Sequence, residues 1–195
     1  MGAKYLRFGG FAVTFAVTYC LASIAMPIGC SHSSPPPAGA PGDKPAPPPC
    51  SSPEPLRVSI HASQRLNPGE SGEALATVLR LYQLKGASKL TGASFDELLD
   101  HDKDTLGEDL LNVQEVTINP GENAEPPMSR HADAAYVAAV ALFRQPVGTS
   151  WRAIKKLSPA DPQHCHATAD RPDGSAPKVD DPARFFLDEN RLELR

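Results

Sequence analysis

The sequence lacks the signatures of the common catalytic nucleophiles and of nucleotide-binding loops. No serine stands in a glycine-flanked elbow of the hydrolase type. Cys165 has histidines beside it, but its surroundings are too irregular to hold a base in place. A glycine-rich loop that could cradle phosphates is also absent. We therefore expect a non-catalytic protein without a cofactor.

Positive charge and long apolar runs are also scarce. The chain has 19 Lys and Arg against 23 Asp and Glu, a formal net charge of −4. Binding to nucleic acid requires clustered basic side chains that neutralise phosphates, so this balance argues against it. Beyond residue 30, no stretch is apolar enough to cross a bilayer.

The first 30 residues have the pattern of a bacterial lipoprotein leader. Lys4 and Arg7 precede an uncharged, largely apolar run over residues 8–28, and a glycine then precedes Cys30. This pattern predicts a signal peptide over residues 1–29 and lipidation of Cys30, whose acyl chains would anchor the protein to a membrane. Cys20 is a poorer site because bulky Tyr19 precedes it. An uncleaved spanning helix remains the alternative, because Pro27 is atypical of lipoprotein cleavage sites and the apolar run is long.

Two of the four cysteines remain once the leader is removed and Cys30 is acylated. These are Cys50 and Cys165, which can pair in an oxidising compartment. Both lie in segments that we expect to be flexible, where nothing fixes the geometry of a disulfide. A bridge and two free thiols are therefore both open.

A proline-rich segment over residues 31–55 separates Cys30 from the folded part. It has few apolar side chains to bury, so we expect a disordered tether that would span roughly 75 Å in polyproline conformation. A ligand for a proline-binding domain is a weaker reading, since no basic residue flanks a well-formed motif. Residues 30–55 thus form a linker, and residues 56–195 form the domain.

The domain shows several short strands and one clear helix start. Alternating apolar residues predict strands near residues 56–61, 75–84 and 113–118, with others at 151–157 and 184–194. Ser94 and Glu97 form a capping box that opens a short helical insertion over about 94–111. Residues 134–143 suit either a helix or a strand buried on both faces, and Pro146 favours the strand. The pattern predicts a mainly β two-sheet sandwich with a flexible loop near 158–182.

Two clusters resemble metal sites. Asp100, Asp102 and Asp104 have the spacing of a calcium loop, but Thr105 replaces the required glycine and Leu111 the bidentate glutamate. His164, Cys165 and His166 could seed a zinc or copper site, although adjacent residues rarely converge on one ion. We expect no metal at either place. A periplasmic lipoprotein that binds a ligand or a metal independently is the alternative function.

An ordered set of residues across the domain matches a known family. The matching residues are Leu66, Asn67, Pro68, Leu79, Arg80, Leu81, Tyr82, Gln83, Leu84, Phe95, Leu98, Leu106, Gly107, Asp109, Leu110, Pro120, Gly121, Tyr136, Val137, Phe143, Arg144, Trp151 and Arg152. In this order, behind a lipoprotein leader and a tether, the chain resembles the type VI secretion lipoproteins of the TssJ (VasD, SciN) family over nearly all of residues 56–157.

The resemblance implies a transthyretin-like β-sandwich anchored in the inner leaflet of the outer membrane and facing the periplasm. It also implies a non-catalytic role, in which the domain binds the periplasmic C-terminal region of TssM, with TssL indirectly in the same complex. In the family the loop between the first two strands makes this contact, which here comprises Asn67, Pro68, Gly69, Glu70, Ser71 and Gly72. Such a loop on a rigid sandwich can present backbone groups to a partner, or it can be a solvated connection.

Overall fold

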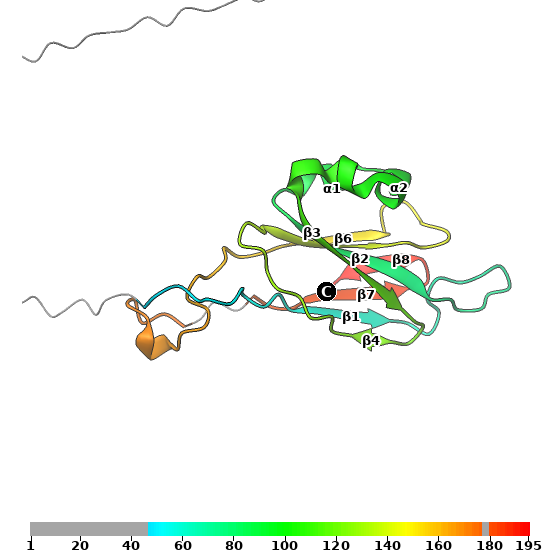
Figure 1. The fold of residues 1–195 in the computed structure, drawn as a ribbon. Helices are drawn as coiled ribbons and strands as arrows, with labels where there is room; N and C mark the ends of the chain where they lie inside the picture. Colours follow the sequence, from blue (N-terminus) through cyan, green and yellow to red (C-terminus); the bar gives the residue numbers. More distant parts are fainter. Residues whose placement is uncertain (1–46, 177–179) are drawn as a thin grey trace, which may run out of the picture. The chain divides into compact units, whose positions relative to one another are not determined.

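The computed structural model describes residues 47–176 and 180–195 as one β-sandwich with a small helical layer (Figure 1). The mainly β, two-sheet fold with a helical insertion that the sequence predicts is confirmed. The leader and Cys30 lie outside the described residues. No helix in the described part of the chain is long and apolar enough to span a membrane.

One sheet has the strand order β4-β1-β7-β8. It consists of β1 (Val58–Ala62), β4 (Asn123–Ala124), β7 (Ala183–Asp188) and β8 (Arg191–Leu194). The strands β1 and β7 are parallel, and the other neighbours are antiparallel. The first strand of the domain is therefore paired with one near the end of the chain.

The other sheet has the order β3-β2-β5-β6 and is antiparallel throughout. Its strands are β2 (Thr77–Leu84), β3 (Leu110–Ile118), β5 (Tyr136–Ala141) and β6 (Arg152–Lys156). Five of the six residues of β5 are buried, so side chains on both of its faces are covered. The choice of a strand for residues 134–143 is thus confirmed.

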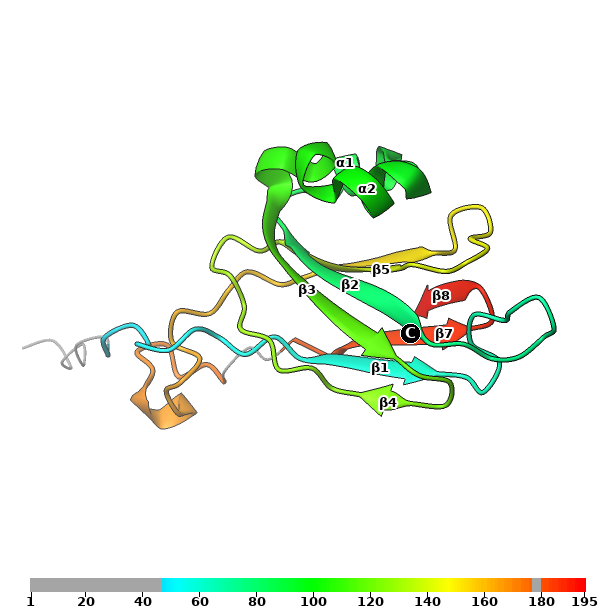
Figure 2. The ribbon, with the colours of Figure 1, turned by 45° about the vertical axis from the view of Figure 1, so that its right-hand side comes forward.

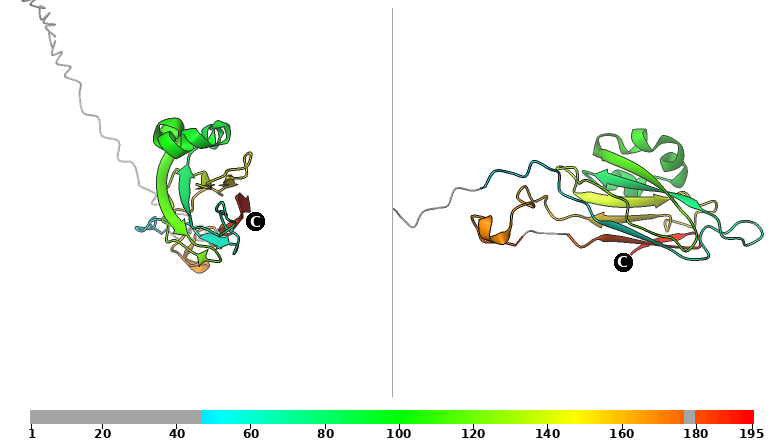
Figure 3. Two further views of the ribbon diagram at one scale, coloured as in Figure 1. Left: turned by 90° about the vertical axis from the view of Figure 1, so that its right-hand side faces the viewer. Right: turned by 60° about the horizontal axis from the view of Figure 1, so that its bottom comes forward.

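The core lies between the two sheets, and strand alternation determines which side chains enter it. On β7, Phe185 and Leu187 are at most 1% exposed, whereas Arg184 and Phe186 face outward. The outward side of the β2–β5 sheet is covered by the helices, while the outward side of the β1–β7 sheet carries no helix (Figures 2 and 3). The two outer faces of the sandwich therefore differ.

The helical layer consists of α1 (Ser88–Gly92), α2 (Phe95–Leu106) and the 3-10 turn η1 (Gly107–Asp109). The predicted capping box is present, because Ser94 Oγ accepts from the Glu97 amide and Glu97 accepts from the Ser94 amide. The helix α2 has twelve residues with a break at His101, and together with η1 it falls within the helical insertion predicted over about 94–111. The helix α1 was not predicted from the sequence, because its N-cap residue Ala87 provides no side-chain cap.

Polar side chains from the sheet hold the helices in place. The Tyr82 hydroxyl donates to Asp102 at 2.9 Å, and Arg80 donates to the carbonyl of Leu98 at 2.6 Å. Arg152 donates to the carbonyl of Ala93 at 2.6 Å. Asp102 therefore binds a phenol within the fold and belongs to a helix, not to a calcium loop.

The buried Tyr82 hydroxyl predicts a stability effect that depends on pH. Replacing Tyr82 with Phe removes a hydrogen bond to a carboxylate, which we expect to cost about 1–3 kcal/mol at neutral pH. Burial, followed by the bond to Asp102, raises the pKa of Tyr82 above its ordinary value of 10. The stabilisation is therefore complete below about pH 10 and decreases as the pH rises toward the folded-state pKa.

Urea unfolding of the wild type and Y82F between neutral and alkaline pH measures this effect. The difference in unfolding free energy should be constant up to about pH 10 and become smaller above it. A difference that stays constant at higher pH would show that Tyr82 is not held in its protonated form by the fold.

Candidate functional site

The loop between β1 and β2 lies at one end of the sandwich, and the Cys50 and Cys165 region lies at the opposite end (Figures 1 and 2). The chain enters the domain at the cysteine end. The loop therefore points away from the side on which the sequence predicts the tether. It contains the six residues, 67–72, that the resemblance assigns to partner binding.

The base of the loop is fixed by Asn67. This residue is 3% exposed and has a positive φ of 46°, a conformation that asparagine tolerates better than most residues. Its side-chain nitrogen donates to the carbonyl of Ala76 at 3.0 Å, and its side-chain oxygen accepts from the amide of Arg144 at 2.9 Å. Its own amide donates to the carbonyl of Glu189 at 2.8 Å. Asn67 thus joins three connections at this end of the sandwich.

Hydrogen bonds within the loop make it compact. The amide of Gly69 donates to the carbonyl of Glu73 at 2.8 Å, and the amide of Gly72 donates to the carbonyl of Gly69 at 3.1 Å. The Glu73 carboxylate lies so close to Gly69 that a Cβ there would be 2.1 Å from it. Gly72 has a φ of 82°, which favours glycine. The loop sequence therefore suits this conformation.

The tip of the loop is exposed and polar. Glu70, Ser71 and Gly72 are all exposed, and the Glu70 side chain is 88% exposed. Glu70 lies 3.7 Å from Arg144 of the β5–β6 loop, a separation at which a surface ion pair contributes little. The tip offers hydrogen-bonding groups to a protein partner. Its contact with a partner remains a prediction.

Arg144 is a residue whose place the sequence did not reveal. It appears in the family resemblance, but no spacing in the sequence indicates that it lies beside residues 67–70. The structure brings its amide to Asn67 and its guanidinium to Glu70 across 77 and 74 positions of the chain. The antiparallel pairing of β2 with β5 brings the start of one strand close to the end of the other. Local sequence patterns do not predict that pairing.

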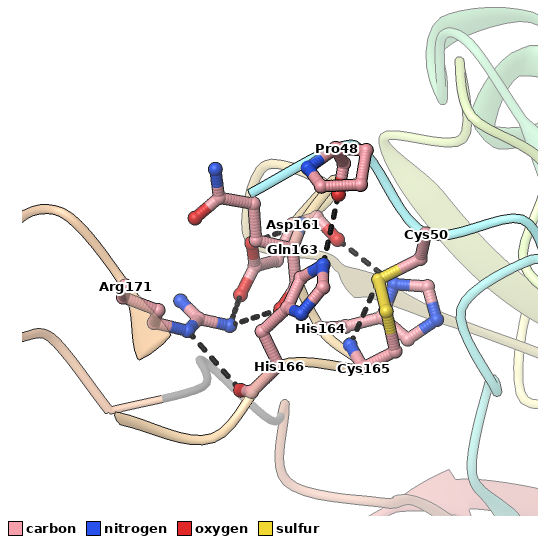
Figure 4. Close-up of a disulfide and its surroundings, with 8 residues drawn as sticks. All are labelled: Pro48, Cys50, Asp161, Gln163, His164, Cys165, His166 and Arg171. Atoms are coloured by element: carbon pink, nitrogen blue, oxygen red, sulfur yellow. Dashed lines mark hydrogen bonds and ion pairs between the residues drawn. A yellow bond between two sulfur atoms is a disulfide. The ribbon is translucent and has the colours of Figure 1, made fainter. Parts of the chain in front are cut away.

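Cys50 and Cys165 form a disulfide with an S–S distance of 2.08 Å (Figure 4). The sequence had left the bridge and the free thiols open. The backbone holds the two together, since the Cys50 amide donates to the carbonyl of Pro162 at 2.9 Å. Arg171, which is 8% exposed, donates to Asp161 at 2.6 Å and to the carbonyl of Gln163 at 2.7 Å. Residues 161–171 thus have internal contacts that support the bridge.

The two histidines beside Cys165 bind main-chain carbonyls. The ring of His166 is 2.8 Å from the oxygen of Pro48, and that of His164 is 3.0 Å from the oxygen of Asp161 (Figure 4). Ligand atoms of Cys50, Cys165 and His166 lie within 4.8 Å of one another. Because both sulfurs are in the disulfide, neither is a thiolate that could bind a metal. This arrangement does not favour a metal site.

Residues 48–54, which the sequence assigned to the linker, make contacts with the domain. Glu54 accepts from the amide of Asp161 at 3.2 Å, and its carboxylate lies 3.5 Å from Arg130. The described contacts therefore begin before Leu56, the predicted start of the domain.

Comparisons with known proteins agree with this architecture. The family model of the type VI secretion lipoproteins (VasD, EvfM, TssJ) matches residues 54–172. No curated protein shows a significant match. Among the similar solved structures, three each cover 73% of this chain. At identities below 25%, these likenesses show the fold alone.

The first of these structures is a type VI membrane complex, with 23% identity, 98% of that chain covered and a TM-score of 0.58. The second is a chain from the structure of the T6SS protein TssM C-terminal domain from EAEC, with 21% identity, 98% covered and a TM-score of 0.56. The third is the T6SS lipoprotein TssJ1 from Pseudomonas aeruginosa, with 22% identity, 97% covered and a TM-score of 0.55.

Proposed function

Because the chain belongs to the type VI secretion lipoprotein family, we propose that it is a non-catalytic, lipid-anchored component of the secretion membrane complex. In this proposal, acyl chains on Cys30 anchor the domain to the inner leaflet of the outer membrane, and the domain faces the periplasm. The loop of residues 67–72 binds the periplasmic C-terminal region of TssM, and TssL joins the same complex through TssM. The protein thus ties the complex to the outer membrane.

The observation that carries this proposal is the position of the loop. It has a fixed base at Asn67, an exposed tip from Glu70 to Gly72, and lies at the end of the sandwich opposite the one at which the described chain enters the domain. A tether that joins the domain at one end leaves the other end free for a partner that comes from the inner membrane. The TssM C-terminal domain named in one similar structure supports TssM as this partner.

A calorimetric titration of residues 31–195 with the periplasmic region of TssM from the same cell tests the proposal. Residues 68–72 are replaced by a glycine-serine segment of equal length, and Asn67 is kept because it joins three connections of the fold. We expect the replacement to weaken binding at least tenfold, or about 1.4 kcal/mol.

A matched control replaces the exposed residues 172–174, which lie in the cysteine region at the other end. This variant should bind TssM as the wild type does. Thermal unfolding of each variant establishes that it is folded. Wild-type protein that is folded but does not bind TssM would overturn the proposed role, and equal binding by the loop variant would overturn the assignment of the loop.

A further inference from the structure

A pocket of about 540 Å³ opens on the helix-free outer face of the β1–β7 sheet. Its volume lies in the range of small-molecule sites, about 300–1,000 Å³. It is lined by Arg57, Ser59 and His61 of the β1 segment and by Arg184 of β7. The proposed contact with TssM uses none of these residues. The proposed contact with TssM therefore does not account for this pocket.

The register of the two strands brings hydrogen-bond donors together in this pocket. Residues 57, 59 and 61 alternate along the chain, so their side chains lie on the same face. Arg184 is the direct partner of Ser59 in the parallel β1–β7 pair. Neighbouring strands are about 4.8 Å apart, so the side chains of Ser59 and Arg184 leave the sheet next to each other on the same face. Two guanidiniums, a hydroxyl and an imidazole thus line one wall.

Two of these donors have no hydrogen-bond partner within the described part of the chain. Ser59 is only 8% exposed, yet its hydroxyl makes no hydrogen bond to a described residue. The Arg184 guanidinium likewise makes no hydrogen bond or ion pair there. Arg57 uses one terminal nitrogen to donate to the carbonyl of Asp180 at 2.7 Å. Because the Ser59 hydroxyl lines the pocket and has no partner among the described residues, it can donate to a ligand there.

The charge and the remaining walls define the class of ligand. Glu125 is the single carboxylate among the lining residues, against the two guanidiniums of Arg57 and Arg184. Pro127 and Met128 provide an apolar wall. An anion with an apolar or neutral body fits these walls. A phosphate can accept from two guanidiniums and a hydroxyl at once, whereas a carboxylate has only two oxygens.

We propose that this pocket binds a phosphate group carried on a larger molecule. The phosphate accepts from Arg184, Arg57 and Ser59, and the body of the molecule packs against Pro127 and Met128. The headgroup of an anionic phospholipid and a soluble phosphorylated glycan share this chemistry. The inference does not depend on the binding of TssM.

Calorimetric titration of the full-length chain in a neutral maltoside detergent tests the proposal. The probes are dihexanoyl phosphatidylglycerol, glycerol phosphate and acetate. We expect saturable binding of the phosphate probes, and no comparable binding of acetate. Arg184→Gln should weaken phosphate binding at least tenfold, and Ser59→Ala should weaken it about fivefold, as expected for a charged and a neutral hydrogen bond.

Arg191→Gln is the matched control, because Arg191 is exposed on the same sheet and does not line this pocket. It should bind phosphate as the wild type does. Tighter binding of the lipid than of glycerol phosphate assigns the site to lipid headgroups, and equal binding assigns it to soluble phosphates. The absence of saturable binding, equal binding of acetate, or an equal loss in the Arg184 and Arg191 variants would overturn the proposal.

Discussion

Replacing Cys50 and Cys165 together with serine is expected to lower the free energy of unfolding by about 2–5 kcal/mol. The bridge joins residues 115 positions apart, so it removes much of the conformational freedom of the unfolded chain. The chain-entropy model gives roughly 5 kcal/mol for a loop of this length, and this is an upper value because the reduced chain retains some structure. Urea unfolding of residues 31–195 at neutral pH measures the loss.

The reduced wild type provides the control for this prediction. Residues 31–195 contain no other cysteine, so a reductant acts on this bridge alone. Reduced wild type and the double serine variant should unfold at the same urea concentration, below that of the oxidised wild type. If the oxidised and reduced wild-type proteins unfolded together, the bridge would not form in solution or would not stabilise the domain.

Local patterns in the sequence predicted most of the strands and the start of the main helix correctly. Alternation of apolar residues placed β1, β2 and β3, because the side chains on one face of each strand contact the core between the sheets. The capping box at Ser94 and Glu97 placed the start of α2 to the residue. These features depend on neighbours a few positions away, and the sequence contains that information directly.

Contacts between distant segments could not be predicted in the same way. The parallel pairing of β1 with β7 joins residues 125 positions apart, and the two-residue strand β4 is too short to show a period. The helix α1 lacks a side-chain cap and has no local signal. The disulfide depends on backbone contacts near Cys165. The composition of that segment had instead indicated a flexible loop without fixed contacts.

The candidate site likewise has features that local sequence patterns predict and features that depend on distant contacts. The turn residues from Pro68 to Gly72 predicted an exposed loop, and the loop is exposed at its tip. The reason for its fixed base was not visible, because Asn67 depends on Ala76, Arg144 and Glu189 from separate parts of the chain. Only the family resemblance linked this loop to a partner. Its binding role therefore requires the titration with TssM.

Replacing Phe185 with alanine is expected to lower the free energy of unfolding by about 3–5 kcal/mol. Phe185 is fully buried on β7 and faces the other sheet, so its removal leaves a cavity in the core. The next residue, Phe186, faces the outer side of the same strand. Its ring stacks on His61 at 4.9 Å, and Arg195 lies 4.3 Å from its centre, so Phe186→Ala should cost only about 1 kcal/mol.

Urea unfolding of the two alanine variants makes this a matched comparison, since the same atoms are removed from adjacent positions of one strand. The large difference follows only if β7 alternates between the core and the open outer face, as its burial pattern shows. Equal losses would indicate that the outer face is covered, and a larger loss for Phe186 would place β7 in the opposite register. In either case Arg184, which shares the outer face with Phe186, would no longer line an open phosphate pocket.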